Sequence, residues 1–118
     1  MARTPDASPL STQVFMILLS LAAEEQHGYA IIQDVARRTE GDLVLTASTL
    51  YAALKRLVEQ GWIVERANRG RDEDARRRYY ALTDRGRAAL RAEARRLDQL
   101  ATMARGLRLI PAAEPRRV

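Results

Sequence analysis

The segment Thr46–Ile63, TASTLYAALKRLVEQGWI, has the pattern of a short amphipathic helix that ends at a glycine. The hydroxyl of Thr46 can cap the first turn, and Gly61 can end the helix in a left-handed conformation. A helix over about Ala47–Gln60 carries one apolar stripe with helical spacing, and this stripe is expected to face a core. It consists of Leu50, Leu54, Leu57 and Val58.

The opposite face of this helix is small, hydroxylated and basic. It carries Ser48, Ala52, Lys55 and, beyond the expected contact zone, Glu59, and it is flanked by Tyr51 on one side and by Thr49 and Arg56 on the other. Small residues near the helix start let the backbone approach the base edges of a DNA groove, where hydroxyl groups can bond to bases or phosphates. A lysine one turn later can neutralise a phosphate or bind a guanine edge. The alternative is a polar face that only meets water, as in most amphipathic helices.

Two β-strands are predicted after this helix, at about Trp62–Ala67 and Arg77–Leu82. Strand residues alternate between faces and Leu82 should point inward, so Tyr80 is expected in the core and Tyr79 nearer the surface. A helix followed by such a ribbon is typical of a winged helix-turn-helix. In that fold the helix enters the major groove of DNA, and the ribbon meets an adjacent groove or the backbone.

The connecting wing, residues 68–76, and the second strand are rich in arginine. Three arginines are predicted to bind the phosphate backbone or a narrow minor groove: Arg76, Arg77 and Arg78. The same loop also contains three acids, Asp72, Glu73 and Asp74. A solvated turn with internal ion pairs is therefore the alternative interpretation of this cluster.

Two helices are predicted before the amphipathic one. The first spans about Pro9–Ala23 with Ser8 as its cap, and its nearly continuous apolar character predicts burial on more than one side. The second spans about Tyr29–Thr39, where apolar residues recur at helical spacing. The apolar run Leu43–Leu45 is expected to pair with the ribbon as a third strand.

A last helix is predicted from Thr83, whose hydroxyl can cap it, to about Leu107. Alanine and leucine recur along one side at spacings near seven, which is typical of a coiled-coil seam, here interrupted at Glu93. A small three-helix core leaves little surface to cover this stripe, so a second copy of the chain is expected to cover it. Packing of the helix back on its own domain is the alternative. The predicted seam consists of Leu90, Ala94, Leu97, Leu100, Ala101, Ala104 and Leu107.

These elements predict a mainly α fold with a small β-ribbon. A winged helix-turn-helix occupies residues 9–82, and a C-terminal dimerisation helix occupies residues 83–107. Residues 1–8 are expected to form a flexible arm, and residues 108–118 a disordered tail. At 118 residues the chain is long enough for one domain with an appended helix and too short for two independent cores.

The composition favours a polyanionic partner and gives no support to catalysis. The net charge is +5, which suits a nucleic acid. The chain has no cysteine and one histidine, His27, so a typical zinc site cannot form and no metal or cofactor is expected. No acidic pair or phosphate-binding glycine loop suggests an enzyme. The longest apolar run, Val14–Ala23, is about half the roughly 20 residues of a membrane-spanning helix, so a cytoplasmic protein without a membrane partner is expected.

Four segments together resemble the PadR family of transcriptional regulators, in its short class with a single C-terminal helix. They are HGYAI at His27–Ile31, STLYAALKRL at Ser48–Leu57, GWI at Gly61–Ile63 and RRYYALTDRG at Arg77–Gly86. The resemblance implies a homodimeric repressor that binds an inverted-repeat operator in double-stranded DNA and is released by a small-molecule effector. It also implies DNA contacts at Tyr29, Ser48, Thr49, Tyr51, Lys55 and the wing arginines.

Two features depart from the family pattern. Many members have Pro-Gly before Thr-Leu-Tyr, where this chain has Ala47 and Ser48, so the local base preference does not carry over. Some short members bind planar drugs through a tryptophan on the last helix, and the last helix here has no aromatic residue. The resulting hypothesis is a dimeric, sequence-specific DNA-binding regulator. The alternative is a winged-helix protein-interaction module that does not bind DNA.

Overall fold

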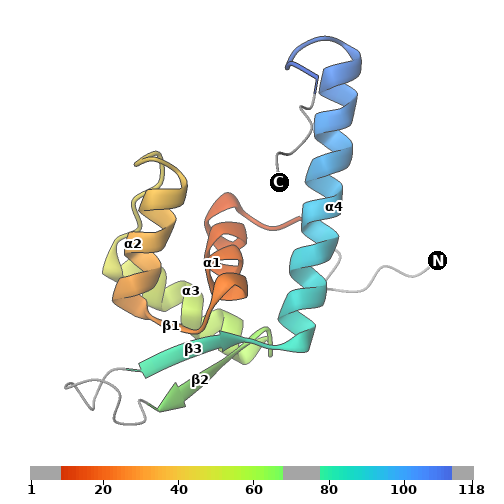
Figure 1. Ribbon diagram of the computed structural model, residues 1–118. Coiled ribbons are helices and arrows are strands. Elements are labelled where there is room, and N and C mark those ends of the chain that lie inside the picture. The colour runs from red at the N-terminus through yellow and green to blue at the C-terminus, as the bar shows by residue number, and fades with distance from the viewer. Residues whose placement is uncertain (1–8, 68–77, 113–118) are drawn as a thin grey trace.

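The computed structural model describes residues 9–67 and 78–112, and Figure 1 shows their arrangement. Several predictions fall on residues that the structure does not describe. They concern the N-terminal arm, Ser8 as the cap of the first helix, the wing with Arg76 and Arg77, and residues 113–118. The elements are α1 (Thr12–Ala23), β1 (Gln26–His27), α2 (Gly28–Arg38), α3 (Ala47–Glu59), β2 (Ile63–Ala67), β3 (Arg78–Leu82) and α4 (Asp84–Gly106).

Side chains cap the helices at their N-terminal ends. Thr46 caps α3 by accepting a hydrogen bond from the Thr49 amide at 3.2 Å, and Thr83 caps α4 through the Gly86 amide at 3.0 Å. Both caps were predicted. The predicted start of the first helix at Pro9 is wrong, because α1 begins at Thr12 behind Ser11. The Ser11 hydroxyl accepts from the Val14 amide at 3.1 Å, a bond that a helix starting at Pro9 would forgo.

The sheet has the strand order β1-β3-β2, and both pairings are antiparallel. Its third strand is Gln26–His27, which pairs with Tyr79 and Tyr80 of β3. The predicted third strand at Leu43–Leu45 is wrong, because these residues lie in the α2–α3 connection without strand pairing. Leu45 is buried in the core instead, which explains the apolar run that suggested a strand.

The core lies between α1, α2, α3 and the sheet, and the beginning of α4 joins it. The α3 stripe is buried at Leu50, Leu54 and Leu57, as predicted. Val58 was also expected inward, but it is 37% exposed, and Ala53 is buried in its place. Ala53 lies on the same side of the helix as Leu50 and Leu57, whereas Val58 lies at the border of the stripe.

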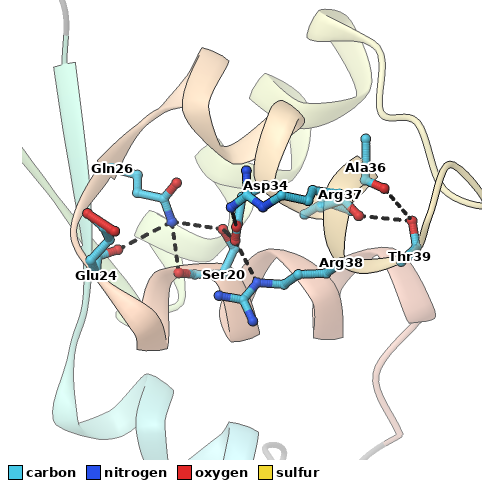
Figure 2. A network of polar contacts seen from close by, with 9 residues as sticks. Ser20, Glu24, Gln26, Asp34, Ala36, Arg37, Arg38 and Thr39 are labelled. Carbon is cyan, nitrogen blue, oxygen red and sulfur yellow. Dashed lines mark hydrogen bonds and ion pairs between the residues drawn. The ribbon is translucent and has the colours of Figure 1, made fainter.

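A buried polar network fixes α2 against α1 and β1 (Figure 2). The Ser20 hydroxyl donates to the Asp34 carboxylate at 2.6 Å, and the Gln26 amide donates to the Ser20 hydroxyl at 2.9 Å. Arg37 and Arg38 of the last turn of α2 pair with the same carboxylate. Because every partner of this buried carboxylate is a donor, the network holds the two helices and the short strand in one arrangement.

The two halves of α4 have different surroundings (Figure 1). The first half contacts α1, and Gly86, Ala89, Leu90 and Glu93 are buried there. The start of α4 lies directly on the β2 side of the domain, since the Thr83 amide donates to the Trp62 carbonyl at 3.1 Å. The second half extends beyond the three-helix body.

Candidate nucleic-acid interface

The outward face of α3 presents the polar side chains that the sequence assigned to DNA. Ser48, Thr49, Tyr51 and Lys55 are all exposed. Thr46 links the hydroxyls at the helix start, because its own hydroxyl donates to the Thr49 hydroxyl at 2.9 Å. The α3 face therefore begins with hydroxyl groups held close together and continues to a lysine one turn further on.

Tyr29 adds a fifth side chain from the start of α2. It is 60% exposed. The preceding residue, Gly28, is buried against the ring of Tyr51, so the beginning of α2 lies beside the α3 face. His27 caps α2, since its Nδ1 accepts from the Ala30 amide at 3.2 Å. The sequence features behind this contact between α2 and α3 are the His-Gly pair and the tyrosine on α3, but only the structure shows that they meet.

Arg78 lies at the base of the wing and is the one predicted wing arginine within the described residues. Its side chain is 68% exposed and donates to the Glu65 carboxylate on β2 at 2.6 Å. This hydrogen bond and the charge of Glu65 raise the pKa of the Arg78 guanidinium. Glu65 therefore partly offsets the positive charge that Arg78 offers to a phosphate, a partner that the sequence analysis had not identified.

The two tyrosines of β3 lie as predicted. Tyr80 is buried and Tyr79 is half-buried. Burial raises the pKa of Tyr80, and the nearby charges of Glu65 and Tyr51 raise it further. The ring of Tyr79 meets the ring of His27 edge-on, with centroids 5.5 Å apart. The contact with His27 joins β3 to β1, the strand that leads into α2.

The predicted seam of α4 divides into one buried residue and six residues nearer the surface. Leu90 is 7% exposed and belongs to the core of its own chain, where α4 packs on the domain. Leu97 and Leu100 are exposed in the second half, as is Leu107 directly after the helix. Met103, which is 64% exposed, was not among the predicted seam residues. The remaining seam residues are Ala94, which is exposed, and Ala101 and Ala104, which are half-buried.

Glu93, the interruption of the seam, is buried and paired with Arg96. Its carboxylate accepts two hydrogen bonds from that guanidinium, at 2.9 and 2.6 Å. The Arg96 hydrogen bonds hold the pKa of Glu93 below its ordinary value despite burial. The acid therefore belongs to the part of α4 that packs on its own domain.

A pocket of about 470 Å³ lies between α1, α3 and the start of α4. Its apolar wall is formed by residues at the start of α1, by Ala53 and Leu57 of α3 and by Trp62. The polar lining consists of Ser11, Arg56, Glu59, Gln60 and, from α4, Arg85. Within the described residues the buried indole N–H of Trp62 has no hydrogen-bond partner.

Residues 9–67 and 78–112 offer neither a metal site nor a membrane span. No group of three or more acidic or histidine side chains there is placed to hold a metal ion. None of the described helices combines the length and the apolar character that crossing a membrane requires.

A helical core with a three-stranded antiparallel sheet and an exposed polar third helix defines a winged helix-turn-helix protein. Residues 17–92 match the family model described as Transcriptional regulator PadR-like family. The chain belongs to this family of DNA-binding transcriptional regulators. It is also 31% identical over 75 residues to an uncharacterised protein, protein X of Lysinibacillus sphaericus, covering 64% of this chain and 68% of that protein.

Several solved structures share the fold. A PadR family transcription regulator from Clostridium difficile R20291 has a TM-score of 0.71 at 24% identity, covering 82% of this chain and 98% of that chain. A PadR family regulator from Eggerthella lenta DSM 2243 has a TM-score of 0.65 at 27% identity, covering 80% and 82%. A RosR-S1 complex structure has a TM-score of 0.59 at 26% identity, covering 86% and 79%.

Proposed function

We propose that this chain is a homodimeric, ligand-responsive repressor that binds an inverted-repeat operator, with α3 in the major groove. The observation that carries the proposal is the exposed set of hydrogen-bonding side chains on α3, together with exposed Tyr29 on α2 and Arg78 on β3. Such a face can bond to base edges, while flanking tyrosine and arginine side chains bond to phosphates. The predicted DNA contacts Arg76 and Arg77 are part of this proposal.

The second half of α4 supports dimerisation. Its exposed leucines and Met103 form a contiguous apolar side that water would otherwise cover. A two-fold dimer joined along this side presents two α3 helices to one side of a duplex. Their half-sites would then be about one helical turn apart, which is the reason for expecting an inverted repeat.

The pocket between α1, α3 and α4 supports a response to a small molecule. An occupant would touch the helix that binds DNA and the helix that joins the dimer, so it could change their relative position. Trp62 lines this pocket and is the single tryptophan of the chain. An effector bound there is expected to change the intrinsic tryptophan fluorescence at the concentrations that release DNA. A compound that releases DNA without this change would place the effector site elsewhere.

Footprinting of the purified protein on genomic DNA, beginning upstream of its own gene, tests the operator. The expected result is protection of a two-fold symmetric site. Fluorescence anisotropy should then show that log affinity falls linearly with log salt concentration, with a slope of roughly −0.9 for each phosphate contact. If no duplex binds even at low salt and a specific protein is captured instead, the chain is a docking module and the proposal is wrong.

A further inference from the structure

The Tyr51 side chain occupies the space where Gly28 would carry a side chain. A Cβ built on Gly28 would lie 2.7 Å from Cζ of Tyr51 and closer still to its hydroxyl oxygen. Gly28 itself is buried, whereas Tyr51 is 48% exposed. The ring of Tyr51 therefore spans from α3 to the first residue of α2, with one side on Gly28 and the other accessible.

Backbone conformation does not require a glycine at this position. Gly28 is the first residue of α2, and the described glycines with positive φ are Gly41 and Gly61. The first position of a helix accepts most residue types, and its own amide is one of the unbonded groups of the helix end. The glycine thus serves the close approach of the Tyr51 ring and not a special turn.

The residues on both sides of Gly28 connect to the other parts of the DNA-facing surface. His27 caps α2 and pairs with Tyr79 of β3, both through the backbone and ring against ring. Tyr29, the residue that follows Gly28, is exposed. The step from β1 into α2 is therefore the place where α2, α3 and β3 meet.

We propose that Gly28 is a positioning residue for DNA binding: by leaving room for the Tyr51 ring, it sets the register between Tyr29 on α2 and the polar face of α3. The inference rests on the proposed function, because it assigns Gly28 a role in the same interface. Gly28 does not touch DNA in this arrangement and acts through Tyr51.

The contact predicts how Gly28→Ala should behave. The atoms nearest to the added methyl group belong to the far end of a side chain, so the Tyr51 ring can rotate away while the helices stay in place. The Tyr51 ring then loses its contact with Gly28, and the position of its hydroxyl relative to Tyr29 changes. DNA affinity is expected to fall about tenfold or more, the effect of losing one hydrogen bond to a charged group.

A double-mutant cycle tests this role on a duplex selected from a random library by the wild-type protein. The four proteins are the wild type, Gly28→Ala, Tyr51→Ala and the double variant, each compared by anisotropy at fixed salt. Gly28→Ala should weaken binding in the wild-type background and have no further effect when Tyr51 is already alanine. Gly106→Ala is the matched control, because nothing lies within 4 Å of its added Cβ.

The outcomes separate the two proposals. If the wild type selects no duplex, the proposed function fails. If the wild type binds DNA and Gly28→Ala binds it equally well, only the positioning role fails. The positioning role also fails if Gly28→Ala weakens binding by the same factor in the Tyr51→Ala background as in the wild-type background. Thermal melting checks that the variants are folded. Should Gly28→Ala not fold, Tyr51→Phe carries the test, since it introduces no clash, and unchanged affinity in that variant overturns the inference.

Discussion

Asp34 lies between α1 and α2, where the Ser20 hydroxyl and two arginines donate to its carboxylate (Figure 2). Burial alone would raise the pKa of this acid. The hydrogen bonds from Ser20 and Arg38, together with the charges of Arg38 and Arg37, outweigh burial and lower the pKa of Asp34 below its usual 3.8. The ionised form is therefore the one that the folded protein favours.

Asp34→Asn is expected to lower the free energy of unfolding near neutral pH by about 1–3 kcal/mol, because a charged acceptor of several hydrogen bonds is lost. The folded-state pKa is lowered, so this stabilisation is present above pH 3.8 and is lost as the pH falls through the folded-state pKa. Urea unfolding over this pH range measures it. The difference between variant and wild type should shrink in acid, whereas Asp98→Asn on exposed α4 should cost little at any pH.

Lys55→Ala tests the α3 face at a single side chain. Specific DNA binding should weaken by about 1–3 kcal/mol if the ammonium group contacts a guanine edge, and by less if it contacts only phosphate. Anisotropy on the selected duplex measures the change. Arg87→Ala removes one positive charge from exposed α4 and serves as control. Equal affinities for Lys55→Ala and the wild type would show that the DNA-binding face has been assigned to the wrong side of α3.

Among the described glycines, Gly86 at the start of α4 lies nearest to the backbone of another segment. A Cβ on Gly86 would lie 2.8 Å from the Trp62 carbonyl carbon and nearer still to its oxygen. Backbone cannot move aside as a side-chain end can. Gly86 therefore allows the first turn of α4 to lie directly on the backbone of Trp62.

Gly86→Ala is expected to destabilise the fold by about 1–3 kcal/mol, the typical cost of overpacking. Replacing glycine by alanine inside an exposed helix normally raises the free energy of unfolding by up to about 1 kcal/mol. The sign of the change therefore distinguishes a crowded glycine from an exposed one. Thermal and urea unfolding measure the change, and Gly106→Ala in the last turn of the same helix is the comparison. A Gly86→Ala protein as stable as the wild type would mean that α4 does not rest on the Trp62 carbonyl.

Elements with a strong periodic pattern could be predicted from the sequence, and those defined by tertiary contact could not. The α3 helix and the caps Thr46 and Thr83 follow from local chemistry, and the structure has them as predicted. The two-residue strand β1 is too short for any alternation, so only its pairing with β3 reveals it. Leu90 follows the same heptad as Leu97, but packing on α1 separates them, and heptad spacing cannot express that difference.

At the scale of the whole molecule, α4 begins on the domain and ends away from it (Figure 1). Its first half completes the core with Ala89 and Leu90, while its second half exposes apolar side chains. The two interpretations that the sequence left open for this helix therefore apply to different halves. The first half packs back on its own domain, and the second half is the surface proposed for a partner copy.

Leu97→Glu combined with Leu100→Glu is expected to convert the proposed dimer into a monomer, because two buried charges without partners would face each other across the seam. Light scattering measures the molar mass of the variant. Its DNA affinity should also fall, because a monomer presents one α3 to one half-site. Gln99→Glu adds a charge to a neighbouring exposed position and should leave the dimer intact. A wild-type chain that is monomeric at micromolar concentration contradicts the proposed assembly.

The firm attachment of α4 at Gly86 has a mechanical consequence for a two-fold assembly. The 23 residues of α4 form a rod of about 35 Å at 1.5 Å per residue. A tilt of roughly 5° at its base would displace the tip by about 3 Å, close to the 3.4 Å rise of one base pair. In the proposed dimer, a small angular change where Gly86 meets Trp62 would therefore change the spacing of the two α3 helices by about one base-pair step.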